Sequence, residues 1–177
     1  PSLSEEVYEF VTDTMLTMLH SGLWPDPLAQ GSRTQGNPRA IDGIIVLDPT
    51  GRVVVASPNA NSMYTRMGMT GYLEKRNLAD VTRAMLSSGE EADETLQLVL
   101  AGRSDLRTEL TIARARVTMR AIPLLKQKGA HIERLGALIL CRDVTELRRR
   151  EMELMTKDAT IREIHHRVKN NLQTVSA

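Results

Sequence analysis

The 177-residue sequence predicts an α+β fold, in which one helix precedes and a long helix follows a domain built on a five-stranded antiparallel sheet. Two observations predict the sheet: two short apolar runs are joined by a turn near residue 50, and three further runs lie between residues 106 and 142. A third observation predicts the last helix, because residues 143–177 contain neither Gly nor Pro and are rich in Glu, Arg, Leu and Met. This order is typical of an α+β domain flanked by two helices.

The composition excludes several classes of function. Aromatic residues make up only 3% of the chain, which is too few for a carbohydrate platform or an RNA surface that stacks bases. The 23 Lys and Arg residues are balanced by 22 Asp and Glu residues, so there is no global basic field to hold nucleic acid. We therefore expect no direct binding of nucleic acid.

Cysteine use and hydropathy point to the cytoplasm. Cys141 is the only cysteine, which excludes an intrachain disulfide and a cysteine-based zinc cage and fits a reducing compartment. The longest apolar runs, such as residues 44–47, are far too short to span a membrane. The chain begins at Pro1 without a signal peptide and stops at Ala177 inside a helical pattern. We therefore expect a fragment of a longer cytoplasmic protein.

Residues 4–21 are expected to form an amphipathic helix. Ser4 can cap its start and Gly22 can end it. Its apolar residues recur at helical spacing: Val7, Phe10, Val11, Met15, Met18 and Leu19. Such a stripe must be buried, either against the next domain or against the same helix of a second chain. Residues 23–40 are rich in Pro and Gly, and we expect an irregular connector between two units.

The mixed domain is expected to span residues 41–145. A turn at residues 48–51 joins two strands as a hairpin, Ser57 and Pro58 open the first of three short helices, and Gly102 ends the third. The other two helices are expected at residues 78–86 and 93–100. The expected strands cover residues 41–47, 52–56, 106–113, 117–125 and 134–142, with a loop at 126–129.

Side chains in this domain give little sign of a cofactor. Cys141 lies in the last strand, not in the helical segment where a flavin photoreceptor needs it, and is expected to be a small buried hydrophobe. His131 is expected to be exposed rather than to bind haem iron. Core filling is expected of three methionines: Met63, Met67 and Met69. Three arginines at even spacings share one face of an expected strand and could hold an anion, but a solvated sheet edge is expected: Arg114, Arg116 and Arg120.

The final helix carries a strict seven-residue apolar repeat, made by Leu147, Leu154, Ile161, Val168 and Val175. Such a repeat is the signature of a seam against another helix. The complementary seam position is charged early, at Arg150 and Lys157, and apolar late, at Ile164. We therefore expect two copies of this helix to pair and to form a homodimer.

One histidine lies on the open face of this helix. On a helical wheel centred on Val168, His166 lies about 160° away, whereas His165 lies about 60° away at the rim of the seam. A neutral imidazole on a solvated face can act as a nucleophile near pH 7. His166 could therefore attack the γ-phosphate of ATP if a second domain delivers the nucleotide.

Three neighbours of His166 could assist such a reaction. Lys169, one turn further on, could offset the phosphate charge, and Asn170 could supply a neutral donor. Glu163 could hydrogen-bond the other ring nitrogen, fix its tautomer and act as the acid-base partner. Two adjacent histidines on a polar helix are, however, usually plain surface residues. A metal site is disfavoured, because adjacent positions point about 100° apart and no third ligand is evident.

The stretch from Ile164 to Gln173 closely resembles the H-box of one class of sensor histidine kinases, the HisKA_2 type near the HWE kinases. The specific core of that motif, H-R-x-K-N-N-L, is met in full. In that family the histidine before the arginine accepts the phosphoryl group from ATP, and this resemblance assigns that role to His166. Other histidine kinases place an acidic residue directly after the histidine. Because Arg167 stands there, Glu163 is the candidate acid-base partner.

Residues 41–145 resemble a PAS domain, whose five-stranded antiparallel sheet carries small helices on one face. The resemblance depends on residues 41–48, Gly51, the helix entry at residues 57–61 and the closing residues 142–146. The closing D-V-T is similar to the motif that couples PAS domains to an output helix. Residues 1–22 resemble the exit helix of a GAF domain, residues 23–40 remain a connector, and residues 146–177 would be the signalling helix with its H-box.

The whole arrangement resembles the GAF-PAS sensor kinases of actinobacteria, which signal through an RNA-binding ANTAR response regulator. The resemblance implies a protein-histidine kinase whose ATP is bound by a kinase domain after residue 177. Residues 1–177 alone would then be inactive, with no cofactor or metal of their own. Two alternatives stay open: a PAS-type dimerisation or ligand-binding module without phosphotransfer, and a nucleic-acid-binding regulator that uses the basic residues of the last helix.

Overall fold

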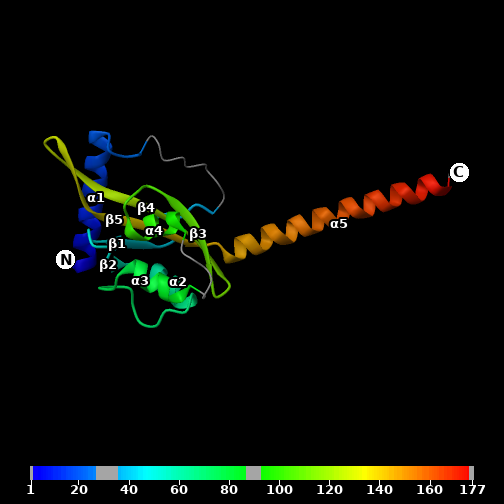
Figure 1. Cartoon of the computed structure of the whole chain (residues 1–177), viewed down its shortest axis with the longest axis horizontal. Coiled ribbons are helices and arrows are strands. Elements are labelled where there is room, and N and C mark those ends of the chain that lie inside the picture. The colour runs from blue at the N-terminus through cyan, green and yellow to red at the C-terminus, as the bar shows by residue number, and fades with distance from the viewer. Residues whose placement is uncertain (1, 27–35, 87–92, 176–177) are drawn as a thin grey trace. The chain divides into compact units, whose positions relative to one another are not determined.

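The computed structural model describes residues 2–26, 36–86 and 93–175. Two compact units are present, Pro1–Val144 and Thr145–Ala177. The first unit contains four helices and five strands within the described residues (Figure 1). Its helices are α1 (Leu3–Ser21), α2 (Pro58–Arg66), α3 (Leu78–Met85) and α4 (Glu94–Ala101). Its strands are β1 (Ile44–Leu47), β2 (Val53–Ala56), β3 (Arg107–Ile112), β4 (Ala115–Lys128) and β5 (His131–Asp143).

The strands form one antiparallel sheet in the order β2-β1-β5-β4-β3, so the last strand of the chain lies at its centre. The predicted hairpin of β1 and β2 is confirmed, with Ile45 opposite Ala56 and Leu47 opposite Val53. β5 pairs with β1 on one side and with β4 on the other. The predicted α+β class with a five-stranded antiparallel sheet is therefore confirmed.

The inner face of the sheet packs against the small helices. Alternate residues of the strands point into this core, as Ile45, Leu47 and Met119 do. Helix α2 contributes the fully buried Tyr64 and Met63, and the segment that follows it contributes Met67 and Met69, so all three methionines predicted to fill the core are buried there. Cys141 is also fully buried there, as predicted for a small hydrophobe.

The outer face of the sheet is covered by α1. Val11 is buried in a second apolar cluster with Ile122, Leu124 and Leu138, which lie on β4 and β5. Of the two partners considered for this helix, the next domain is thus the one that covers its apolar stripe. Phe10 and Leu19, which were expected within the stripe, are exposed because they lie at its margins.

Four local predictions need correction. The cap of α1 is Ser2 rather than Ser4, because Ser2 and Glu5 form a reciprocal capping box. The first strand was expected to begin at residue 41, but Ile41 is exposed and β1 begins only at Ile44. The expected loop at 126–129 is mostly strand, since pairing continues to Lys128 opposite His131. Arg114 is not on a strand: with Ala113 it forms a two-residue turn in which both residues have positive φ.

The predicted helix-ending Gly102 allows a test of the packing. Its φ is +63°, and a Cβ built there would lie 2.2 Å from the Cβ of Ala137. Gly129 has almost the same φ, +59°, but open space around it. We expect Gly102→Ala to lower the free energy of unfolding by about 2–4 kcal/mol, whereas Gly129→Ala should cost about 1 kcal/mol of backbone strain. Equal urea midpoints for the two variants would contradict this account.

Candidate functional site

The second unit consists of one helix, α5, which spans Thr145–Val175. Only Val144 separates it in sequence from β5. None of its described side chains is buried. A helix of this length gains little stability from propensity alone, so its own ion pairs and any partner decide whether it persists.

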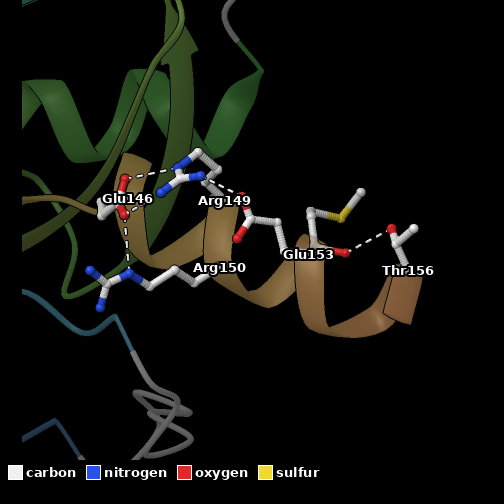
Figure 2. Close-up of polar contacts among 6 residues, drawn as sticks. Glu146, Arg149, Arg150, Glu153 and Thr156 are labelled. Atoms are coloured by element: carbon white, nitrogen blue, oxygen red, sulfur yellow. Dashed lines mark hydrogen bonds and ion pairs between the residues drawn. The ribbon is translucent and has the colours of Figure 1, made fainter. Parts of the chain in front are cut away.

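The start of α5 is held by a network of charged side chains (Figure 2). Glu146 accepts hydrogen bonds from Arg149, at 2.7 and 2.9 Å, and from Arg150, at 3.0 Å. Arg149 also pairs with Glu153. These contacts join residues three and four apart, the spacing at which side chains meet on a helix. The hydrogen bonds from the two arginines lower the pKa of Glu146 to about 2.

The seven-residue repeat forms an exposed apolar row along α5. The exposed fractions are 63% for Leu154, 52% for Ile161 and 50% for Val168. Ile164 and Leu172, at 55% and 64%, widen the row in its second half. Exposed aliphatic side chains that follow one helix stripe are typical of a surface that a second helix covers.

His166 lies on α5 with its side chain exposed, as the helical wheel predicts. Its Nδ1 lies 3.3 Å from Nδ2 of Asn170, one turn further along. In this orientation the amide donates and the ring nitrogen accepts, so the ring proton would be on Nε2. Rotating the amide by half a turn would place its oxygen against a protonated Nδ1 and leave the lone pair of Nε2 free.

Glu163 does not make the contact expected of it. Its carboxylate accepts a hydrogen bond from Arg167 at 2.6 Å instead of meeting the His166 ring. Arg167 lies four residues on, where a long guanidinium reaches a carboxylate readily. In the structure it is therefore Asn170 that contacts the ring. Lys169 is exposed one turn from His166, so its ammonium is open to an anion that reaches this face.

Polar contacts in the first unit were not anticipated from the sequence. Asp105 accepts hydrogen bonds from Arg120, both at 2.9 Å, and from the indole nitrogen of Trp24 at 3.2 Å. Arg66 pairs with Asp143, the last residue of β5, at 3.3 Å. These pairs join residues that lie far apart in the sequence, and no spacing rule could have found them.

The inner core offers little titratable chemistry. Tyr64 donates to the Thr82 hydroxyl at 2.8 Å, because Thr82 itself donates to the carbonyl of Leu78. Burial raises the pKa of Tyr64, and burial with the nearby Asp42 charge raises the pKa of Cys141 to about 12. Both groups are therefore neutral at physiological pH.

His131 is exposed, as predicted. Within the described ranges, no cluster of three or more His, Cys, Asp or Glu residues could hold a metal ion, and no helix is long and apolar enough to cross a membrane.

The sheet with its small helices places the chain in a known fold family. A family model described as the PAS fold matches residues 39–149, and the chain belongs to that family. A second model, described as histidine kinase, matches residues 163–177, the stretch that contains His166. The resemblance of residues 41–145 to a PAS domain and that of the stretch around His166 to a histidine kinase are confirmed.

The similarity extends to particular signalling proteins. The chain is 48% identical over 177 residues to the sensor histidine kinase PdtaS of Mycobacterium tuberculosis, and 44% identical over 176 residues to PdtaS of Mycolicibacterium smegmatis. Each match covers 98% of this chain and 34% of the relative, so the chain spans about a third of these relatives. A solved structure, the sensor region of a sensor histidine kinase, is 39% identical with a TM-score of 0.70, and the match covers 84% of this chain and 56% of that one.

The charge network at the start of α5 predicts a dependence on pH. The pKa of Glu146 is lowered from 4.5 to about 2 in the folded chain. Its stabilising contribution is therefore present above pH 4.5 and is lost as the pH falls toward 2. Titration of the Glu146 carboxyl by NMR should give a value well below 4.5. In Arg149→Gln the value should rise toward 4.5, and an unchanged low value in that variant would contradict the assignment.

Proposed function

We propose that this chain is the sensory and phosphoacceptor part of a two-component sensor histidine kinase, in which the PAS domain regulates phosphorylation of His166. The observation that carries the proposal is the position of this imidazole. It is exposed on α5, within the segment matched by the histidine kinase model, while the apolar row follows the opposite side of the helix. A nucleotide-binding domain could reach the ring even when the row is covered.

The proposed reaction uses the free nitrogen lone pair of the neutral imidazole. A bond forms between that nitrogen and the γ-phosphorus of ATP, and the bond from this phosphorus to the bridging oxygen breaks. ADP leaves with the electron pair, and a base takes the proton from the other ring nitrogen. ATP is bound by a kinase domain outside residues 1–177. The phosphoryl group then passes to a response regulator, and the resemblance points to one of the RNA-binding ANTAR type.

The neighbours of His166 have separate roles in this proposal. In the structure the amide nitrogen of Asn170 faces Nδ1. Once the amide is rotated so that its oxygen accepts from Nδ1–H, Asn170 would hold the tautomer in which Nε2 is the nucleophile. Lys169 offsets the charge of the incoming phosphates. Glu163 accepts the proton only when its pair with Arg167 opens, which the high exposure of both side chains permits.

Pairing of α5 makes the active species a homodimer. Leu154, Ile161 and Val168 are at least half exposed, and a second copy of the same helix would cover them. The PAS domain, with residues 41–145, is joined to α5 through β5 and the D-V-T segment. A change in the PAS domain would then alter the access of the kinase domain to His166, in a switch between two states. We place the protein in the cytoplasm.

Phosphorylation of the full-length protein tests the proposal. We expect His166→Ala to abolish the acid-labile label from γ-labelled ATP, whereas His165→Ala, at the adjacent position, should keep it. Asn170→Ala should lower the rate, by about tenfold or more, without abolishing the label. Residues 1–177 alone should remain unlabelled but should accept label from an added kinase domain. Label that survives in His166→Ala would favour a PAS-type binding or dimerisation module without phosphotransfer at this site.

A further inference from the structure

A groove of about 540 Å³ lies beside α2 in the first unit, outside the apolar core. One wall is a face of α2, where residues recur at helical spacing, and the other is the loop that contains Tyr72 and Glu74. A volume of this size is in the range that holds a small molecule. The residues of α2 that line it are Pro58, Asn61, Ser62, Thr65 and Arg66.

Glu74 presents a fixed negative charge to this groove. Its Oε1 accepts hydrogen bonds from the backbone N–H of Ala56 at 3.3 Å and from Asn61 at 3.2 Å. Asn61 is held in turn by the N–H of Leu73, at 3.0 Å. Oε2 has only a 3.4 Å contact to Asn61, and no Lys, Arg or His in the described part of the chain pairs with this carboxylate. An oriented carboxylate with spare acceptor capacity is suited to bind a cation.

The other lining groups are also suited to a donor-rich cation. Thr65 donates its hydroxyl proton to the carbonyl of Asn61 at 3.0 Å, so the lone pairs of its oxygen remain available. Ser62 carries an exposed hydroxyl on the same face of α2. Tyr72 is 75% exposed and offers a ring face, which attracts a cation through its quadrupole. Together these groups supply acceptors for the three N–H donors of an ammonium group.

We propose that this groove binds a small molecule that carries a primary ammonium group, with Glu74 as its counter-ion. Arg66 also lines the groove and uses its Nε for Asp143, so its terminal nitrogens can take a carboxylate of the same ligand. Because Asp143 ends β5 and is the first residue of the D-V-T segment, an occupant that competes for Arg66 would act on that segment directly. Binding requires no phosphotransfer, so this proposal and the function of His166 can fail independently.

The charge of Glu74 also reaches α1. Burial, and secondly the nearby Glu74 carboxylate, raise the pKa of Tyr8. A cation held at Glu74 offsets that negative charge, so the NMR signals of Tyr8 should respond to ligand binding near neutral pH, although α1 does not line the groove.

The test is an NMR titration of the whole chain with three small probes: butylamine, γ-aminobutyrate and butyrate. The two amines should give saturable shifts at groove residues, and butyrate, which lacks the ammonium group, should give none. Tighter binding of γ-aminobutyrate would assign the ligand to amino acids, and equal binding would assign it to simple amines. Absence of saturable shifts up to tens of millimolar amine would overturn the proposal.

Variants separate the site from general effects on the fold. Glu74→Gln keeps an acceptor for Ala56 but removes the charge, and should weaken amine binding by about tenfold or more. Tyr72→Ala changes an exposed side chain that the fold does not need, and should also weaken it. Glu133→Gln, on the β4–β5 hairpin, is the matched control and should bind as the wild type does. Undiminished amine binding in Glu74→Gln would also overturn the proposal.

Discussion

The apolar row of α5 is the constraint on which the proposed mechanism depends. Leu154, Ile161 and Val168 are exposed, and no side chain of this helix in the described part of the chain is buried. Local ion pairs such as Glu146–Arg149 add only small stabilisation on an exposed surface. A helix of this kind needs a partner to bury its stripe. Pairing through that row would leave His166 on the free side, where a phosphate donor can approach.

The first unit has a different physical basis, because its sheet is covered on both faces. Small helices cover the inner face, where Tyr64 is fully buried, and α1 covers the outer face through Val11. The central strand β5 contacts both layers and leads in sequence to α5. The helix before the domain, α1, packs on the strands at the centre of the sheet, and the helix after it, α5, follows the central strand β5 in the chain.

Periodicity and turn residues predicted most of the elements, because these signals are local. Ser57, Asp93 and Gly102 mark helix ends in the sequence and do so in the structure. Contacts between distant residues carry no such signal, which is why the pair of Arg66 with Asp143 and the groove around Glu74 were not foreseen. The contact between Glu163 and His166, three residues apart, was predicted from spacing alone, but the guanidinium of Arg167, four residues from Glu163, takes that carboxylate in the structure. Part of the connector, residues 27–35, lies outside the described residues.

The pairing of α5 is tested most directly by the mass of the chain in solution. Sedimentation equilibrium should give a dimer, and Ile161→Asp should shift it to monomer because the change places a charge within the apolar row. Met152→Asp is the matched control: this residue is also exposed, at 58%, but lies about 160° around the helix from Leu154. A wild-type chain that stays monomeric, or a dimer that is as stable in Ile161→Asp as in the wild type, would contradict the account.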